Sequence, residues 1–391
     1  MQKRPAHILP LIVLSQFAGT SLWFAGNAIL PDIQLELNIH GNALGNITSV
    51  VQFGFIAGTL VFAIFSIADR FASSKVFFVS CMVAAAGNVS IIWLAKNMAT
   101  LFVLRFITGF FLAGIYPVGM KIAADWYEKG LGKALGYLVG ALVIGTAFPH
   151  LLKSNLYALP WKQVLLFTSL FAVLGGLLIL LFVGEGPFRK EGGQFRPSVI
   201  FQIFRSADFR AAAFGYFGHM WELYTFWAFV PTIISLYSST DHEINISSWS
   251  FMIIAIGGLS CIAGGYMSQK IGSGRVAFYA LICSGLCCLA SFSYFQLPFP
   301  AFVSIMLVWG ISVIADSPQF STLVAQTAIP EYKGTALTMV TSVGFAITIA
   351  SVQLINYVFH TWTKANHVFV LLAPGPIIGL IFLLRLVKEK K

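Results

Sequence analysis

Charged side chains are scarce in this chain. Only 10% of its 391 residues are Asp, Glu, Lys or Arg, whereas soluble domains carry about 25%. Hydrophobic residues make up 58% of the chain, and the mean hydropathy is +0.84. These values exclude an ordinary soluble globular protein and predict an integral membrane protein.

Motifs for metal and nucleotide chemistry are also absent. The sequence has no His-Glu-x-x-His motif, no paired histidines and no phosphate-binding loop. Its five cysteines lie in apolar segments without paired metal-ligand spacing, so small apolar helix residues are favoured over a metal site or a disulfide framework. We therefore expect no metal site and no cofactor.

Long apolar runs take the place of these motifs. A helix that crosses a bilayer needs about 20 apolar residues, and runs of that length recur along the whole sequence. Twelve spanning helices are predicted near residues 8–30, 44–67, 76–95, 99–122, 132–152, 161–183, 210–236, 248–268, 275–295, 299–325, 334–357 and 366–386. The predicted fold class is an all-α membrane protein with twelve transmembrane helices.

The two halves of the sequence resemble each other. Features of the first half that return in the second are Phe17 and Pro31 as Phe217 and Pro231, the turn 69–75 as 269–275, Gly109 and Pro117 as Gly310 and Pro318, and 132–135 as 334–337. Parallel membrane repeats are related by an axis along the membrane normal. We predict two pseudo-symmetric six-helix bundles, residues 1–184 and 206–391, joined by a cytoplasmic linker, residues 185–205.

The basic residues indicate how the chain is oriented. Lys and Arg cluster at both termini and in every second loop, whereas the alternate loops hold only Lys96, Lys153, Lys162 and Lys364. Cytoplasmic loops are enriched in Lys and Arg, so both termini are predicted to be cytoplasmic. The net charge of +10 is then explained by topology and anionic lipid headgroups, and no nucleic-acid partner is expected.

Two motifs carry a family resemblance. The sequence Ala68-Asp69-Arg70-Phe71, followed by Lys75, lies between the second and third spans, and Arg105-Phe106-Ile107-Thr108-Gly109 lies in the fourth. Together with twelve spans divided six and six, they resemble the major facilitator superfamily of secondary transporters, although Ser66 or Ile67 stands where the family pattern has glycine. The resemblance implies a substrate cavity near the bilayer midplane that opens to each side in turn. The stretch 218–222 is faintly similar to permeases of the cyanate and nitrate type.

The first motif suggests a cytoplasmic gate. Asp69, Arg70 and Lys75 carry both signs of charge, and we expect Asp125, at the cytoplasmic end of the fourth span, to pair with Arg70 or Lys75 while the gate is shut. Such partly buried pairs can bias a two-state equilibrium. A solvated positive-inside loop is the alternative.

Four ionisable residues fall deep inside predicted spans, where charge is costly. They are Arg105, His219, Glu222 and Asp316. The rise of an α-helix per residue places Arg105 and Glu222 at a similar depth in the membrane, so they could meet across a cavity. We expect Glu222 to carry a coupling proton, His219 to tune it, and Arg105 to hold either Glu222 or an anionic solute. Asp316 is the second candidate for the proton carrier, and purely structural buried pairs are the alternative.

Three predicted helices carry stripes that mix hydrogen-bonding and aromatic groups at helical spacing. The stripes are Gln16, Thr20, Trp23 and Asn27; Arg105, Gly109, Leu112 and Tyr116; and Trp309, Ser312, Asp316 and Gln319. Small-molecule pockets have this character, although a polar seam between helices would look the same. The expected substrate-binding residues are Gln16, Trp23, Asn27, Arg105, Tyr116, Trp221, Tyr224, Trp309 and Gln319.

These residues predict secondary active transport of a small polar, anionic solute by alternating access, coupled to protons. Import by symport and export of drugs or metabolites by proton antiport both stay open. We expect a monomer in a bacterial cytoplasmic membrane, in contact with lipids, solute and the coupling proton, and no enzyme activity. An integral membrane enzyme or a transporter-like sensor is the remote alternative.

Overall fold

The computed structural model describes residues 5–37, 43–127, 131–154, 158–189, 196–238, 244–362 and 365–388. All secondary structure in these ranges is helical, which confirms the all-α architecture expected from the sequence. The chain forms two compact units, Met1–Ile39 with Val50–Gln194 and His40–Ser49 with Phe195–Lys391. Part of the predicted linker, residues 190–195, and both chain termini lie outside the described residues.

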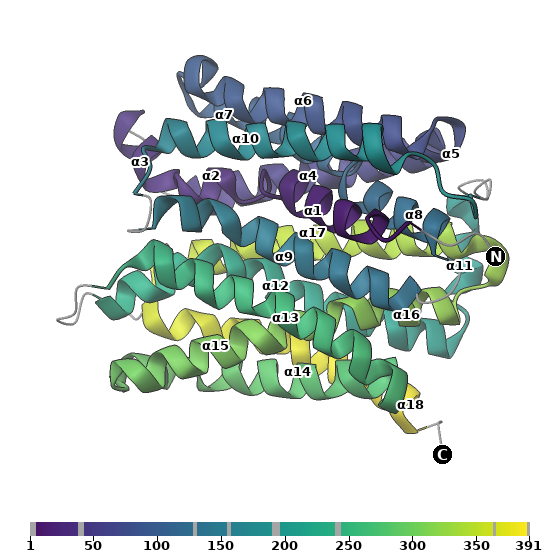
Figure 1. The fold of residues 1–391 in the computed structure, drawn as a ribbon. Helices are drawn as coiled ribbons and strands as arrows, with labels where there is room; N and C mark the ends of the chain where they lie inside the picture. The colour runs from purple at the N-terminus through teal and green to yellow at the C-terminus, as the bar shows by residue number, and fades with distance from the viewer. Residues whose placement is uncertain are drawn as a thin grey trace. The chain divides into compact units, whose positions relative to one another are not determined.

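The first unit is built from long helices that lie side by side, with α6 between α7 and α10 (Figure 1). Asn97 begins α7 with a capping box, in which its side-chain oxygen accepts from the backbone N–H of Thr100 at 3.0 Å. The helices are α1 (Ile8–Thr20), α2 (Ala25–Ala28), α3 (Leu30–Glu36), α4 (Ala43–Ile64), α5 (Ile67–Arg70), α6 (Ser73–Leu94), α7 (Met98–Leu112), α8 (Tyr116–Trp126), α9 (Leu131–Lys153), α10 (Trp161–Leu178) and the π-helical turn η1 (Ile179–Val183).

The second unit contains the other long helices and the first residues of α4. Asn245 caps α13 by accepting from the backbone N–H of Ser248 at 2.7 Å. The helices are η2 (Pro197–Val199), α11 (Ile200–Ile203), α12 (Ala207–Ser238), α13 (Ile246–Ile271), α14 (Ser273–Ala290), η3 (Ser291–Gln296), α15 (Phe299–Ala315), α16 (Ser317–Thr327), η4 (Pro330–Tyr332), α17 (Lys333–Thr361), η5 (Ala365–Leu372) and α18 (Pro374–Lys388).

Among the described residues, 10 helices are long and apolar enough to cross a membrane. The other two predicted spans are those at 8–30 and 210–236. The span expected at 210–236 is α12, which has 32 residues and includes His219 and Glu222. The span expected at 8–30 is not one helix, because the chain leaves helical structure at Ser21–Phe24, between α1 and α2.

Two predicted spans bend at matching places. The span 99–122 divides into α7 and α8, and the span 299–325 divides into α15 and α16. In each case a proline, Pro117 or Pro318, lies in the first turn of the second helix, where its missing N–H costs no hydrogen bond. Asp316 is the residue that separates α15 from α16.

The repeated glycines mark close helix contacts in both units. A Cβ atom added at Gly109 of α7 would overlap the carbonyl oxygen of Val51 in α4. A Cβ atom added at Gly310 of α15 would overlap the carbonyl oxygen of Ile253 in α13 in the same way. The repeat seen in the sequence therefore preserves a backbone-to-backbone contact for which only glycine is small enough.

Replacing Gly109 with valine should force α7 away from α4. We expect a loss of about 1–3 kcal/mol of folding free energy from overpacking, measured as a lower thermal unfolding temperature of the purified protein. Gly132→Val is the matched control, because nothing lies within 4 Å of a Cβ atom added there. Equal unfolding temperatures for the two variants would contradict the close contact.

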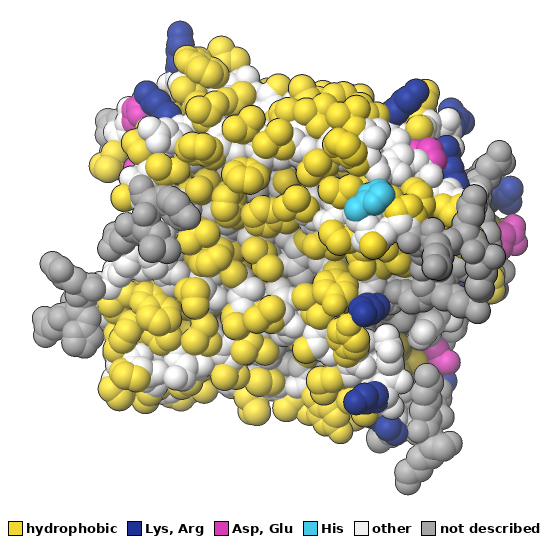
Figure 2. Space-filling view, viewed as in Figure 1, with side chains coloured by type: hydrophobic (Ala, Val, Ile, Leu, Met, Phe, Trp, Pro, Cys, Tyr) yellow, Lys and Arg dark blue, Asp and Glu magenta, His cyan; other side chains and the backbone are white. Residues whose placement is uncertain are grey.

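Large apolar side chains are exposed along the helices of both units. Figure 2 shows hydrophobic side chains over most of the visible face, with Lys, Arg, Asp and Glu near the helix ends. The exposed residues include Phe53, Trp93 and Val103 in the first unit and Leu259, Tyr279 and Leu286 in the second. Water does not favour such surfaces, whereas lipid does, so these faces fit an integral membrane protein.

Candidate functional site

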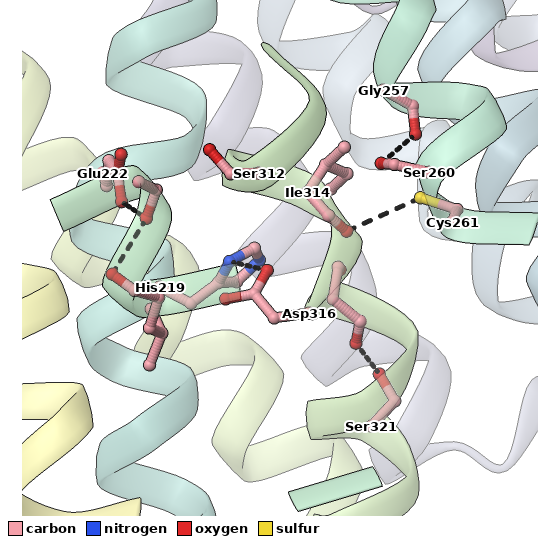
Figure 3. Close-up of polar contacts among 12 residues, drawn as sticks. His219, Glu222, Gly257, Ser260, Cys261, Ser312, Ile314, Asp316 and Ser321 are labelled. Atoms are coloured by element: carbon pink, nitrogen blue, oxygen red, sulfur yellow. Dashed lines mark hydrogen bonds and ion pairs between the residues drawn. The ribbon is translucent and has the colours of Figure 1, made fainter. Parts of the chain in front are cut away.

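A buried histidine and a buried aspartate meet in the second unit. His219 extends from α12 toward Asp316 at the break between α15 and α16 (Figure 3). The distance from His219 Nδ1 to Asp316 Oδ1 is 2.9 Å, and each side chain is 1% exposed. The rings of Tyr216 and Phe320 lie 6.0 and 5.7 Å from the imidazole centre and enclose it. The sequence-based expectation paired His219 with Glu222 instead.

Each member of this pair keeps one polar atom without a hydrogen-bond partner among the described residues. These atoms are Nε2 of His219 and Oδ2 of Asp316, and Oδ1 of Asp316 has only the ion-pair contact with Nδ1 of His219. Burying a polar atom without a partner is costly, so the rest of the site must impose this arrangement. A proton placed on Oδ2 would break no hydrogen bond among the described residues.

Glu222 lies one helical turn from His219 and is fully occupied by neutral donors. Its Oε1 accepts from the indole N–H of Trp309 at 2.6 Å and from the thiol of Cys288 at 3.2 Å, and its Oε2 accepts from the hydroxyl of Ser284 at 2.9 Å. Trp309 is held in turn by stacking on Phe226, with ring centres 4.4 Å apart. Glu222 thus joins α12 to α14 and α15.

Arg105 is fully buried in the first unit, where it binds backbone and amide oxygens. Its Nη1 donates to Asn88 Oδ1 at 2.9 Å, and its Nη2 donates to the carbonyl oxygens of Leu22 at 3.1 Å and Trp23 at 2.7 Å. These two carbonyls lie in the break between α1 and α2, so they are not used within a helix. Arg105 and Glu222, which the sequence analysis expected to meet, each have hydrogen-bond partners inside their own unit.

The remaining predicted solute-binding residues of the first unit lie in different elements. Gln16 packs over Gly119 of α8, and both polar atoms of its amide lack a partner among the described residues. Trp23 packs against Phe55 of α4, with ring centres 4.9 Å apart. Asn27 is buried in α2, and Tyr116 is half-buried at the start of α8.

In the second unit, several of the predicted aromatic residues are used in packing. Trp221 donates from its indole N–H to the carbonyl oxygen of Leu371 in η5 at 3.0 Å. Tyr224 lies between Trp227 and Phe345, with ring centres 5.2 and 5.1 Å away. Gln319 is buried in α16. Trp309 donates a hydrogen bond to Glu222, which the sequence analysis predicted as a proton-coupling residue.

The predicted cytoplasmic gate has different ion pairs from those expected. Asp69 pairs with Lys121 of α8 at 2.6 Å. Arg70 and Lys75 are exposed, and among the described residues neither forms an ion pair with Asp125, whose Oδ2 is buried without a partner. The pairing of Asp125 with Arg70 or Lys75 in a shut gate stays a prediction, and in this structure Lys121, one helical turn before Asp125, pairs with Asp69.

A segment that the sequence analysis did not assign to the gate completes this cluster. Glu185 accepts from the backbone N–H and the hydroxyl of Ser74 at 3.1 and 2.9 Å, and its other oxygen pairs with Arg189 at 2.8 Å. Arg189 also donates to the carbonyl oxygens of Asp69 and Phe71. Glu185 thus satisfies the N-terminus of α6. The signal in the sequence was a charged stretch that begins directly after an apolar span.

Removing the charge of Glu185 should loosen this cluster. We expect Glu185→Gln to cost about 1–2 kcal/mol of folding free energy, because a charge-assisted contact and a favourable helix-end interaction become neutral. The measurement is thermal unfolding of the purified protein. Glu331→Gln, at an exposed position, is the control and should change little; an equal effect of both substitutions would contradict the capping role.

The turn before this cluster shows why the family pattern has glycine at this position. Ser66 adopts a left-handed conformation, with φ 50° and ψ 41°, directly before α5. Glycine is the residue that accepts this conformation without strain, so the structure shows why glycine is favoured in this turn.

Within the described residues, no group of three or more His, Cys, Asp or Glu side chains could hold a metal ion.

Comparisons with known proteins agree with this architecture. An uncharacterized protein of Campylobacter jejuni is 23% identical over 283 residues, which cover 71% of this chain and 86% of that protein. The galacturonate transporter of Dickeya chrysanthemi is 27% identical over 195 residues, which cover 44% of this chain and 56% of the transporter. The solved structure of the human organic anion transporter MFSD10 superposes with a TM-score of 0.70 over 97% of this chain and 100% of that one, at 16% sequence identity, and so shares the fold.

The family model described as Major Facilitator Superfamily matches residues 12–352. That range extends into both units and includes the helix breaks in each of them and the turn around Asp69. Since the match covers most of the sequence and the fold agrees with that of a solved family member, the chain belongs to the Major Facilitator Superfamily of membrane transporters.

Proposed function

We propose that this protein is a proton-coupled secondary transporter of a small organic anion. The observation that carries the proposal is the buried His219–Asp316 pair, which keeps an unpartnered atom on each side chain inside helices that cross the membrane. Ionisable groups at such depth are costly, and they mark ion pathways and proton relays. Membership in a transporter family supports the same reading.

The proton site of the proposal is the pair itself. When Asp316 is ionised it holds His219, and α12 is tied to the break between α15 and α16. When Asp316 takes up a proton on Oδ2, the negative charge that attracts the imidazole ring is lost and this contact weakens. A change in one proton thus alters the contact between two helices, which is the kind of local event that biases a two-state transporter.

For the solute we propose a hydroxylated carboxylic acid of the size of galacturonate. The name of the Dickeya relative supports this class, and so does Gln16, whose buried amide offers a donor and an acceptor that match a solute hydroxyl group. Arg105 is no longer the first choice for the carboxylate, because its guanidinium binds three oxygens of its own unit.

The cytoplasmic cluster is proposed to act as a gate during transport. Asp69, Lys121, Glu185 and Arg189 join the ends of α5, α6 and α8 through partly buried contacts. Contacts of this kind contribute about 1 kcal/mol each, enough to shift a conformational equilibrium several-fold. We also propose that the chain acts as a monomer in a bacterial cytoplasmic membrane with both termini in the cytoplasm.

Uptake into proteoliposomes tests the proposed function. Purified protein is reconstituted, an inward proton gradient is imposed, and accumulation of radiolabelled galacturonate is followed alongside other sugar acids and inorganic anions. Accumulation above the external concentration that a protonophore abolishes is the expected result. Uptake that the protonophore leaves unchanged would overturn proton coupling, and an absence of uptake across the whole panel would overturn the solute class.

A further inference from the structure

The two units place a buried charge at the same three-helix junction, but the charges have opposite signs. In the first unit Arg105 joins α7 to α6 and to the break between α1 and α2. In the second unit Glu222 joins α12 to α14 and α15. The sequence repeat makes these helices equivalent, because Phe17 of α1 returns as Phe217 of α12, and Gly109 of α7 returns as Gly310 of α15.

The equivalence extends to single residues around both charges. Helices α6 and α14 begin at Ser73 and Ser273, so Asn88, which binds Arg105, corresponds to Cys288, which binds Glu222. Arg105 itself corresponds to Met306, a fully buried residue of α15. One junction therefore uses a cation among acceptors, and the other uses an anion among donors.

The difference follows from the helix that enters each junction. In the first unit the chain is broken at Leu22 and Trp23, so their carbonyl oxygens are free to accept from a guanidinium. In the second unit α12 is continuous from Ala207 to Ser238, and its carbonyl oxygens are used within the helix. The side chain of Glu222 supplies the acceptor that the backbone no longer offers.

The contacts of Glu222 also distinguish it from a proton carrier. Trp309 is a donor only and needs an acceptor at Oε1 whatever the proton does. Both oxygens of Glu222 are already engaged, whereas Oδ2 of Asp316 is not. Proton exchange at Glu222 would disturb a complete set of hydrogen bonds, whereas a proton on Oδ2 of Asp316 would affect only the contact with His219.

We infer that Glu222 is a positioning residue: by accepting from Trp309, Ser284 and Cys288 it fixes the rotation of α12 against α14 and α15, and so keeps His219 within reach of Asp316. His219 precedes Glu222 by one turn of α12, and Asp316 follows Trp309 by two turns at the end of α15. A rotation of α12 that breaks one contact breaks the other. This inference rests on the proposed proton coupling through His219 and Asp316.

The test separates the charge of Glu222 from its acceptor role. Glu222→Gln keeps a carbonyl oxygen that accepts from Trp309 and adds an amide N–H that can donate to the hydroxyl oxygen of Ser284. Glu222→Leu and Trp309→Phe each remove the hydrogen bond between residues 222 and 309. The controls are Glu331→Gln, which is exposed, and Trp249→Phe, which packs against Phe299 outside the junction. For each variant, accumulation of radiolabelled galacturonate under a proton gradient is compared with its exchange at equilibrium, both per folded protein in proteoliposomes.

We expect Glu222→Gln to keep the ratio of accumulation to exchange and to lower both rates no more than about five-fold, as neutral hydrogen bonds replace charge-assisted ones. Glu222→Leu and Trp309→Phe should lower the ratio by about ten-fold or more, because exchange does not need the His219–Asp316 contact. A ratio lost in Glu222→Gln would make Glu222 the carrier and overturn the inference. A ratio unchanged in the other two variants would reduce Glu222 to a stability role and also overturn it.

A second measurement needs no solute. In thermal unfolding of the detergent-purified protein, the effects of Glu222→Leu and Trp309→Phe should be clearly less than additive in the double variant, because either change breaks the same contact. Full additivity would contradict the junction. If the wild-type protein transports none of the anions tested, the proposed function fails, and this cycle still decides whether Glu222 and Trp309 act as one unit.

Discussion

Asp316→Asn should abolish proton-driven accumulation of the solute and leave equilibrium exchange in place. The substitution preserves the size of the side chain and removes its titratable proton, so the helices can still move while no proton is carried. Asp316 is chosen because it is buried, lies 2.9 Å from His219 and keeps Oδ2 unpartnered. The measurement is uptake of radiolabelled galacturonate into proteoliposomes with and without a proton gradient, followed by counterflow exchange.

Asp208→Asn is the matched control. Asp208 also belongs to α12 and forms an ion pair with Arg385, but both side chains are more than two-fifths exposed. Exposed pairs contribute little, so this variant should accumulate solute as the wild-type protein does. Full gradient-driven accumulation in Asp316→Asn would contradict the assignment of Asp316 as the proton carrier. The carrier would then be Glu222 or another group of the chain.

The helices could be predicted from the sequence because their causes are local, and two of the helix breaks have a local cause as well. Apolar runs of spanning length, the prolines in the first turn of α8 and α16, and the repeated glycines all act within a few residues of their own position. The repeat added a long-range constraint, because a glycine contact inferred once could be expected twice. Family membership was recognisable for the same reason, since the turn around Asp69 and the motif at Arg105 are short and contiguous.

The partners of the buried charges could not be predicted, because they depend on helix rotation and on breaks without a sequence signal. His219 and Glu222 share one side of α12, yet one meets Asp316 and the other meets Trp309. The break that gives Arg105 its two carbonyl acceptors falls at residues 21–24, where the sequence has neither proline nor glycine. The depth of Arg105 was inferred correctly as buried, but depth alone suggested a partner in the other half.

The cytoplasmic cluster illustrates a second limit. Asp69 and Asp125 were recognised as acids among basic residues, and Arg70 or Lys75 was expected to pair with Asp125. The structure instead directs Lys121 to Asp69 and leaves Arg70 and Lys75 exposed. Long basic side chains near a membrane edge can satisfy their charge in water, so sign and spacing narrow the choice of partners without deciding it.

Arg105→Leu should destabilise the first unit strongly without changing the affinity of the folded protein for its solute. The guanidinium binds three buried oxygens, those of Asn88, Leu22 and Trp23, and leucine leaves all three without this donor. At about 1 kcal/mol or more for each unpaired acceptor, the loss should exceed about 3 kcal/mol. Arg105→Lys should fall between wild type and leucine, because a single ammonium cannot reach three separated acceptors as the planar fork does.

Thermal unfolding and solute binding measured on the same preparations decide between this structural role and the one first expected from the sequence. If Arg105 held the solute carboxylate, Arg105→Lys would weaken binding while the unfolding temperature stayed near that of the wild-type protein. The structure predicts the reverse order, a lower unfolding temperature with unchanged binding in the folded fraction. Arg70→Lys, at an exposed position, should alter neither quantity, because its charge is solvated before and after the change. A loss of affinity confined to the Arg105 variants would therefore mean that the guanidinium of Arg105 binds the solute.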